Sequence, residues 1–491
     1  MPPPPPPPPH QSPPPPSPVP PLRAHRLPLQ PATSPPTSLL LAPRPSPSRA
    51  LALLFPDSSA RLFPSLPTAS PASSPAPTVV PAPLAAAACF VLLLPSSHLL
   101  FLSAHPSPSS PVLHLRAYTL SSGRFSPAQL SFKRQASASG LPLHGLPFGL
   151  GVRLAGGVNA VALLSLAAGQ IWVLAPRMAA DRRTVELHKC AVVELEPARP
   201  VYAMEIAMGK LLLGEVGGVR VFRLRDLMKS GIEREGRKES IVAAVRKSLY
   251  KRNGILNGFI VPVGHGSGGG GDKGEAVSTR KLTTLRVKQT LGSYCSFVSA
   301  FSSEDHYPQG GIEVTNATKV VSIHPLSKEK FLVLDSAGVL HVFSPPNKEL
   351  FTEATSKGYC GSRTYRLDNA MKVQLFAVFP SSSTSVFSSW LCCFCIMVVY
   401  FINKCVQSVC AETQIFWISD GRNSIHIMSA LDAEPPNSEN GGGDGEREFT
   451  TIKLRAIEAI FTSEKVQDIV PISKDAVLIL GQGNMFLYET A

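Results

Sequence analysis

Five segments of the chain share one pattern of hydrophobic and polar positions. Each begins with a run of apolar residues, turns at a glycine, and continues as a second apolar run. In two copies, at Val219–Arg223 and Val339–Phe343, apolar and polar residues alternate along this second run. The five copies are Ala162–Leu174, Lys210–Leu224, Lys330–Phe343, Gln414–Met428 and Ala476–Tyr488.

Each copy predicts a β-hairpin. A continuous apolar run is typical of a strand buried on both faces, and alternation is typical of a half-buried one. A tight hairpin turn needs a residue with positive φ, which glycine adopts without strain. We therefore assign a structural turn role to Gly169, Gly217, Gly338, Gly421 and Gly483, with Asp335, Asp420 and Asn484 as accompanying turn residues.

A further short strand is predicted ahead of three hairpins, at Val201–Ile206, Val320–Pro325 and Val466–Pro471. One strand, a polar loop and a hairpin make up three strands of a four-stranded propeller blade. The fold class expected is therefore mainly β, a degenerate β-propeller of about six or seven blades over residues 150–491. A pair of β-sandwich domains is the alternative.

Residues 150–491 resemble the WD40-like β-propeller repeat proteins. No Trp-Asp dipeptide ends a predicted blade and no Gly-His opens one, so the structural triad of that family cannot be transferred to named residues. The resemblance implies a non-enzymatic scaffold that binds other proteins through the loops of a rigid disc.

Two insertions interrupt the predicted propeller. The first, residues 225–280, combines a Gly-rich loop with a basic stretch in which Ile241, Val245 and Leu249 form an apolar stripe at helical spacing. The basic residues beside this stripe are candidates for docking a partner, and they are Arg246, Lys247, Lys251 and Arg252. The alternative is a surface helix that packs on the propeller.

The second insertion, residues 383–412, is apolar and rich in cysteine. Its core, residues 386–402, has the hydropathy of a short membrane-spanning helix, so a single-pass membrane protein is an alternative function. The segment separates a predicted strand at 373–379 from the hairpin at 414–428, within what should be one blade. We therefore also consider it a retained intron translated in frame.

The N-terminal region differs in composition from the rest. Of the 49 prolines, 37 lie in residues 1–150. Proline removes a backbone donor and disfavours both helix and sheet, so we expect residues 1–149 to be disordered. The shortage of acids in this region also fits a plastid transit peptide.

Charge and cysteine content limit the choice of partners and compartment. The formal net charge of +13 arises mainly in residues 1–180, which hold eleven Lys/Arg and one acid, so nucleic acid is not indicated as a partner of the predicted propeller. The nine cysteines do not form a spaced disulfide framework, which favours the cytoplasm or nucleus over an oxidising compartment. A membrane location follows only if residues 386–402 span a bilayer.

No pattern of catalytic residues stands out. The chain contains no Gly-x-Ser-x-Gly, no His-Glu-x-x-His and no glycine loop that opens a helix for a nucleotide. We therefore expect no catalytic residues, cofactor or metal, and other proteins as partners. An enzyme with its active site in the central pocket of the propeller is the remaining alternative, and it would need carboxylates or histidines that converge from the innermost strands.

Overall fold

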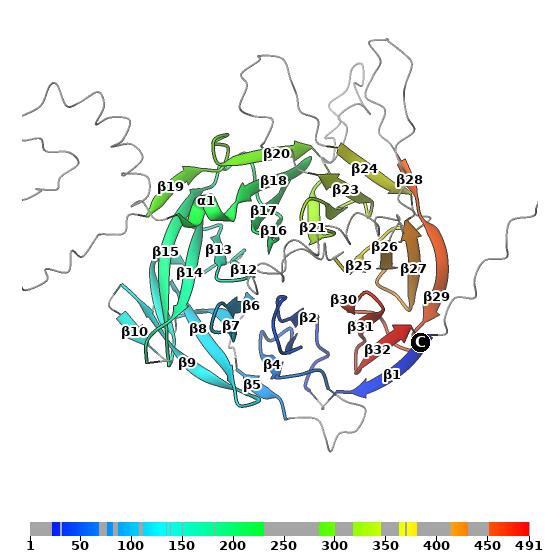
Figure 1. Ribbon diagram of the computed structural model, residues 1–491, viewed down its shortest axis with the longest axis horizontal. Helices are drawn as coiled ribbons and strands as arrows, with labels where there is room; N and C mark the ends of the chain where they lie inside the picture. Colours follow the sequence, from blue (N-terminus) through cyan, green and yellow to red (C-terminus); the bar gives the residue numbers. More distant parts are fainter. Residues whose placement is uncertain are drawn as a thin grey trace, which may run out of the picture.

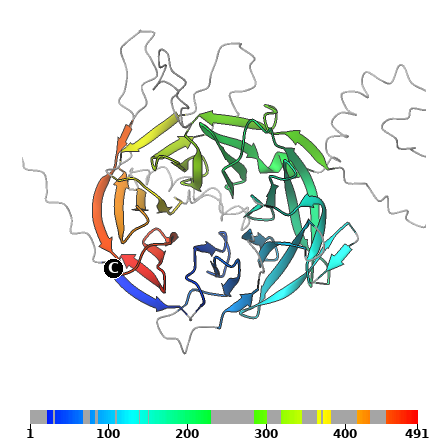
Figure 2. The same ribbon diagram turned by 180° about the vertical axis from the view of Figure 1, so that it is seen from behind.

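The computed structural model describes residues 22–29, 32–67, 76–81, 87–107, 111–229 except 134, 138, 150 and 182, 284–299, 318–344, 363–368, 371–380, 414–430 and 451–490. The strands in these residues form seven blades arranged around a central axis (Figure 1 and Figure 2). We call the four strands of a blade A to D from the axis outward. The fold is thus the expected propeller, and not a pair of sandwiches.

The first three blades follow one another along the chain. Blade 1 consists of β2 (Ser38–Leu41), β3 (Leu51–Leu54), β4 (Ala60–Phe63) and β5 (Thr78–Val80). Blade 2 consists of β6 (Ala88–Leu93), β7 (His98–Pro106), β8 (Val112–Ser121) and β9 (Arg124–Phe132), to which β10 (Gln135–Ser137) and β11 (Leu141–Pro147) are added. Blade 3 consists of β12 (Arg153–Gly156), β13 (Val161–Ser165), β14 (Gln170–Met178) and β15 (Thr184–Glu194).

The remaining blades complete the ring. Blade 4 holds β16 (Ala203–Ala207), β17 (Lys210–Glu215), β18 (Gly218–Arg223) and β20 (Cys295–Ser299), with α1 (Leu224–Met228) and β19 (Leu285–Lys288) between the last two. Blade 5 holds β21 (Val320–Pro325), β22 (Phe331–Asp335), β23 (Leu340–Ser344) and β24 (Arg363–Asp368). Blade 6 holds β25 (Leu375–Val378), β26 (Gln414–Ser419), β27 (Ser424–Ala430) and β29 (Arg455–Phe461), preceded by β28 (Thr451–Lys453). Blade 7 holds β30 (Asp468–Ser473), β31 (Ala476–Leu480), β32 (Asn484–Thr490) and β1 (Leu22–Pro28).

Blade 7 joins the two ends of the chain. Strand β1 is the outer strand of this blade and pairs antiparallel with β32, from Leu22 opposite Thr490 to Pro28 opposite Asn484. Figure 1 shows the first and last strands side by side on the rim. At the axis, the backbone N–H of Leu39 in β2 donates to Oδ2 of Asp468 in β30 at 2.7 Å. The ring is therefore closed by contacts at both its outer and inner edges.

The core is divided among the interfaces between blades. Seven clusters of buried apolar side chains occur in the described residues, and each combines two adjacent blades. Between blades 4 and 5, for example, Leu212 and Val219 pack with Phe331, Val333 and Phe343. Burial on both faces explains why the B strands read as continuous apolar runs: all five residues of β13, β22 and β31 are buried.

The five predicted hairpins are confirmed as the B and C strands of blades 3 to 7. The predicted leading strands correspond to β16, β21 and β30, and β25 pairs with β26 as expected for the strand at 373–379. The polar members of two C strands are buried, not exposed: Arg220 in β18 and His341 in β23. Each meets an acid of the preceding strand, Glu215 and Asp335 respectively.

The expectation that residues 1–149 are disordered, with the propeller starting at 150, is wrong for the described part of that region. Residues 22–149 supply blades 1 and 2 and the closing strand β1. The prolines fall mostly in connections and at strand ends, as in the turn at Pro56, so they leave the short apolar strands intact. The polyproline run at residues 2–9 lies outside the described residues.

Both predicted insertions fall between strands of one blade. The first begins with α1 and lies between β18 and β20 of blade 4, and the second lies between β25 and β26 of blade 6. Residues 230–283 and 381–413 are outside the described part of the chain, and so is the candidate span at 386–402. Among the residues that are described, no helix has the length and apolar character to cross a membrane. The retained-intron hypothesis stays a prediction.

Neighbouring blades are also linked along their outer edges. The start of strand D of one blade, or a short strand just before it, pairs in parallel with strand D of the preceding blade. This occurs three times, in the pairs β15 with β9, β19 with β15, and β28 with β24. On the loop face, turns bond to the next blade, as when Val373 N donates to Gly338 O at 3.0 Å. These bonds make the ring a single rigid support for its loops.

Candidate binding face

Two hollows lie next to each other on one face of the ring. This face carries the turns between strands B and C and the connections from strand D to strand A of the next blade. Blades 7, 1 and 2 contribute to it here. Phe55, in the B–C turn of blade 1, lines both hollows. We call the first the inner pocket and the second the outer groove.

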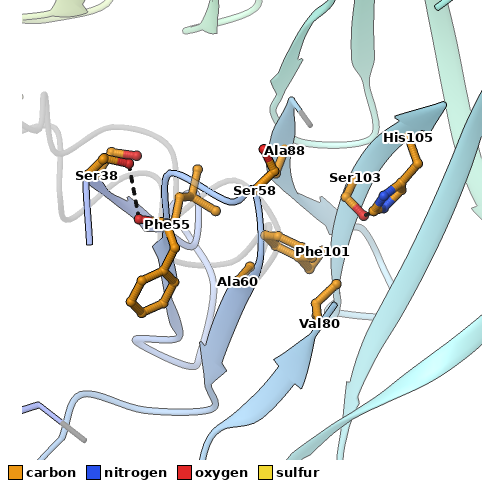
Figure 3. A pocket seen from close by; sticks show the side chains of 11 residues that line it. Ser38, Phe55, Ser58, Ala60, Val80, Ala88, Phe101, Ser103 and His105 are labelled. Atoms are coloured by element: carbon orange, nitrogen blue, oxygen red, sulfur yellow. Dashed lines mark hydrogen bonds between the residues drawn. The ribbon is translucent and has the colours of Figure 1, made fainter. Parts of the chain in front are cut away.

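The inner pocket lies between blades 1 and 2 and has a volume of about 240 Å³. Figure 3 shows Phe55 on one side of it and Ser103 with His105 on the other. Its lining combines hydroxyl groups, one imidazole and apolar walls, and none of the described residues in it is an acid, a lysine or an arginine. The lining residues are Thr37, Ser38, Leu54, Phe55, Ser58, Ala60, Val80, Ala88, Phe101, Ser103 and His105.

His105 and Ser103 form the polar end of the inner pocket. They are two residues apart on β7, so both side chains lie on the same face of the strand. Ser103 Oγ is 2.7 Å from His105 Nε2, and both residues are buried. Burial, followed by the charges of Arg116 and His114, lowers the pKa of His105 to about 4, so the ring is neutral at pH 7.

This pair has the spacing of a nucleophile and its base, but it lacks the third member of a catalytic triad. His105 Nδ1 is buried and has no hydrogen-bond partner in the described part of the protein. A triad needs an acceptor at this position to orient the imidazole and stabilise its positive charge. The described residues therefore do not complete a catalytic triad around Ser103.

The B–C turn of blade 1 shapes the wall between the two hollows. Asp57 Oδ1 accepts from the N–H of Ser59 at 2.9 Å and from its hydroxyl at 2.6 Å. The pKa of Asp57 is lowered by these hydrogen bonds, the hydroxyl contributing most. Ser58 has φ of 64°, in the region that favours glycine. The turn thus places a strained serine at the pocket, which is a common feature of binding sites.

The outer groove is larger, about 500 Å³. It lies between the connection from β1 to β2 and the B–C turn of blade 7. Prolines and small residues make up most of its described lining, in which no side chain is charged. The lining residues are Leu29, Ala32, Thr33, Ser34, Pro35, Pro36, Phe55, Gln482 and Gly483.

Glu464 fixes the wall of the groove that contains Gly483. Its Oε2 accepts from Gly483 N at 2.7 Å and Oε1 accepts from the side-chain amide of Asn484. Burial opposes the charge of Glu464, but these hydrogen bonds outweigh burial and lower its pKa. Asn484 Oδ1 in turn accepts from Arg26 Nε in β1 at 2.9 Å. The closing strand therefore holds the turn in place.

Titratable side chains also occur on the innermost strands, within the three leading strands that the sequence predicted. Glu205 lies on β16, His324 on β21 and Asp468 on β30. Burial raises the pKa of Glu205 to about 8 and lowers that of His324 to about 4. Burial also raises the pKa of Asp468 to about 6 although two backbone N–H groups oppose it. No group of three potential metal ligands occurs among the residues that are described.

The glycines selected from the sequence lie in the B–C turns of blades 3 to 7, on the same face as the pocket. Gly169, Gly217, Gly338 and Gly421 have φ between 60° and 86°, as predicted. Gly483 also lies in its B–C turn, but its φ is outside this region. The candidate docking residues Arg246, Lys247, Lys251 and Arg252 are not among the described residues.

Sequence reasoning missed the inner pocket because it lies in the region expected to be disordered. The signal that would have found it is Ser103-Ala104-His105 at the end of an apolar run. Period-two spacing in a strand places a hydroxyl and an imidazole on one face. The interruption of that apolar run at Pro95–Ser97 lies in the turn between β6 and β7.

Comparisons with known proteins give only distant matches. No family model and no curated protein matches the chain. Among solved structures, it is similar to the β-propeller domain of Swd1 from Myceliophthora thermophila, with 8% identity, 94% of this chain and 98% of that chain covered, and a TM-score of 0.44. It is also similar to a chain of a PRC2 complex (8% identity, 95% and 94% covered, TM-score 0.42) and to Chaetomium thermophilum Raptor (8%, 95% and 29% covered, TM-score 0.38).

Proposed function

We propose that this protein is a scaffold that binds other proteins through the face formed by blades 7, 1 and 2. The observation that carries the proposal is the pair of adjoining hollows, which share Phe55 and have no charged side chain among the lining residues that the structure describes. A pocket beside an open groove suits an extended segment of polypeptide, with a side chain in the former and backbone in the latter.

The rigidity of the ring supports this role. The loops that line the hollows are attached to strands of three blades. The bond from Leu39 N–H to Asp468 connects blade 1 with blade 7, and a buried apolar cluster joins blade 1 to blade 2. A preorganised surface loses little conformational entropy on binding, so most of the entropic cost of binding comes from ordering the partner. Neither hollow has a lysine or arginine among its described lining residues, which also argues against a phosphate backbone as the ligand of this face.

Selection of peptides tests the proposal. A random peptide library displayed on phage is selected against the purified full chain, and the affinities of the selected peptides are measured for two variants. Gln482→Glu adds a negative charge to the wall of the groove. Lys474→Glu changes charge at the exposed A–B turn of the same blade, at the opposite end of β31.

We expect selected peptides to lose about tenfold or more in affinity for Gln482→Glu, because a carboxylate would be desolvated beneath the peptide. They should bind Lys474→Glu as they bind the wild type. Failure to enrich any peptide, or equal losses for the two variants, would contradict a binding role for this face.

A further inference from the structure

Blade 2 carries an imidazole and a guanidinium beside the inner pocket. His114 and Arg116 are two residues apart on β8, so both lie on one face of the strand. Across the ladder, His114 is opposite His105 of β7, and Arg116 is opposite Ser103. Ser103 and His105 are the residues that β7 contributes to the inner pocket (Figure 3). The pair on β8 therefore continues the same sheet face outward, from strand B to strand C.

A glycine next to β11 borders both side chains. A Cβ added to Gly140 would lie 3.3 Å from Nδ1 of His114 and 3.7 Å from Nε of Arg116. Nitrogens of two different side chains therefore lie within contact distance of one point. Nε of Arg116 donates to the backbone oxygen of Ser139 at 2.8 Å, and this bond is exposed to solvent. The loop between β10 and β11 thus fixes the guanidinium next to the imidazole.

Hydroxyl groups and a second imidazole complete the group. Ser137 Oγ lies 3.3 Å from Ser139 Oγ, and it accepts from the backbone N–H of Gly140 at 3.3 Å. His144, on β11, is close enough for its charge to act on His114. All the side chains of the group are half-buried or exposed, so solvent reaches them. We call the group the blade 2 cluster, and its members are His114, Arg116, Ser137, Ser139 and His144.

The blade 2 cluster has no carboxylate to balance its charge. Residues 58–180 contain no Asp and no Glu. Within the described part of the chain, Arg116 makes no ion pair, and its one hydrogen bond is the bond from Nε to Ser139. Among these residues nothing occupies the two Nη groups of the guanidinium, each of which is a donor.

The positive charges around His114 repel one another. Burial lowers the pKa of His114, and the charges of Arg116 and His144 lower it further. Burial, followed by the charges of Arg116 and His114, likewise lowers the pKa of His105 to about 4. No carboxylate is among the charges that act on either ring. An anion bound here would relieve the repulsion and favour the protonated form of His114.

A phosphate group matches the donors of the blade 2 cluster. A carboxylate has two oxygens, which one guanidinium satisfies with two parallel hydrogen bonds. The cluster holds imidazoles and hydroxyls in addition to its guanidinium, so it offers more donors than a carboxylate uses. A phosphate ester has three acceptor oxygens and carries close to two negative charges at pH 7. One phosphate is expected here, not a nucleic-acid backbone, because the adjoining hollows have no lysine or arginine among their described lining residues.

We propose that the blade 2 cluster binds a phosphate group on a phosphorylated side chain of the partner segment, with Arg116, His114 and His144 as its cationic contacts. The inference rests on the proposed function. The inner pocket adjoins the outer groove at Phe55, and its β7 side belongs to the same sheet face as the cluster. A segment that leaves the groove over the B–C turn of blade 1 would meet the cluster on blade 2.

Binding of phenyl phosphate to the full chain tests the site without any partner. Its affinity is measured by phosphorus NMR for the wild type and for two variants. Arg116→Gln removes the guanidinium and should weaken binding about tenfold or more, because hydrogen bonds between charged groups are the strong ones. Arg124→Gln is the matched control, since Arg124 is exposed at the start of β9, at the other end of β8 from His114. It should bind as the wild type does, and equal affinities for the wild type and Arg116→Gln would overturn the proposal.

The pH dependence of anion binding tests the imidazoles on the wild type. Phenyl sulfate keeps one negative charge between pH 5.5 and pH 7.5, so a change in its affinity reports protonation of the protein. Its affinity should be about threefold or more higher at pH 5.5, because His114 takes up a proton as the anion binds. His114→Gln should weaken this dependence, and Arg124→Gln should keep it. An affinity for the wild type that does not vary with pH would overturn the proposal, whether or not Arg116→Gln folds.

Peptides distinguish the two sources of a phosphate group, a phosphorylated polypeptide and a small phosphate ester. Two pools of random peptides, which differ only in a central phosphoserine or serine, are bound to the full chain. We expect the phosphoserine pool to bind about tenfold or more tightly, and to lose this advantage in Arg116→Gln. Equal binding of the two pools would overturn the proposal even if phenyl phosphate binds, because the phosphate would then not belong to the partner segment.

The outcome for the phosphate site is separable from the outcome for the scaffold. Selected peptides that depend on Gln482, together with equal binding of the serine and phosphoserine pools, would overturn the phosphate site and leave the scaffold role. Binding of phosphoserine peptides through Arg116 with equal affinities for Gln482→Glu and Lys474→Glu would have the opposite meaning.

Discussion

Arg220 and Glu215 form a two-pronged ion pair inside blade 4. Nε of Arg220 lies 2.5 Å from Oε1 of Glu215, and Nη2 lies 2.9 Å from Oε2. The side chains are 5% and 2% exposed. Gln289, which is fully buried, adds a third bond to Oε1 at 2.8 Å. Burial opposes the charge of Arg220, but the hydrogen bond and charge of Glu215 outweigh it and raise its pKa.

Removal of Arg220 alone should strongly destabilise the protein. Arg220→Met leaves the Glu215 carboxylate buried without its cation, which costs about 3–5 kcal/mol. The double variant Arg220→Met/Glu215→Gln removes the charge as well and should recover part of this loss. Urea denaturation of the single and double variants measures the difference. A single variant no less stable than the double one would contradict the role assigned to the pair.

The hairpin glycines should differ in their tolerance of alanine. Gly338 has φ of 86°, and an added Cβ would lie 2.4 Å from Lys372 Cγ and 3.0 Å from the backbone oxygen of Val373. Gly338→Ala should therefore cost about 1–3 kcal/mol. Gly483 is outside the left-handed region and its nearest neighbour to such a Cβ is 3.8 Å away, so Gly483→Ala is the control. Thermal unfolding of the two variants should separate them, and equal midpoints would count against the turn assignment.

Asp468 should contribute a pH dependence to stability. Its pKa is raised to about 6 in the folded protein from an ordinary value of 3.8, because burial disfavours the charged form. The folded state therefore keeps a proton that the unfolded state has released. The contribution of the protonated Asp468 to the free energy of unfolding is fully present below pH 3.8. It is lost as the pH rises through 6, by up to about 1.4 kcal/mol per pH unit.

The variant Asp468→Asn isolates this contribution. It cannot titrate, so the difference in unfolding free energy between wild type and variant should shift in favour of the variant from pH 4 to pH 7. His105 and His324 act in the opposite direction, since their lowered pKa values favour folding above pH 6.5. Their effect is common to both proteins and cancels in the difference. A difference that does not vary with pH would contradict the burial of Asp468.

The closing strand should be needed for a stable ring. Deletion of residues 1–31 removes β1 and leaves the outer edge of β32 unpaired over seven residues. We expect the unfolding midpoint to fall by at least 5 °C, since each kcal/mol lost shifts it by about 2–4 °C in a large domain. Deletion of residues 1–21 keeps β1 and serves as the control. Indistinguishable midpoints for the two truncations would show that closure by β1 is dispensable.

The part of the fold that the sequence predicts is the part whose turns are made by glycine. Blades 3 to 7 were identified because an apolar run followed by glycine is a strong hairpin signal. Blade 1 uses serine at the corresponding B–C turn, where Ser58 has φ of 64°, and in blade 2 Ser97 has φ of 55° in the A–B turn. Serine in a proline-rich stretch is compositionally typical of disorder. The short strands between these turns therefore went unrecognised.

The candidate site was hidden for the same reason, and also because its members are distant in sequence. Ser58 and His105 are brought together by the packing of blade 1 against blade 2, which no local pattern encodes. Gln482 reaches Phe55 only because β1 closes the ring between blades 7 and 1. The buried pairs made by Arg220 and His341 were likewise missed, because alternation in a strand does not reveal whether its polar face is covered by the next element.

Amide hydrogen exchange over residues 51–63 tests the central claim, that the proline-rich N-terminal region belongs to the propeller and builds its binding face. Strands β3 and β4 occupy most of this segment, and the amides between them are paired in an antiparallel ladder. The structure predicts strong protection there, comparable to that of β31 in blade 7. Complete exchange of residues 51–63 within seconds, while β31 remains protected, would contradict it.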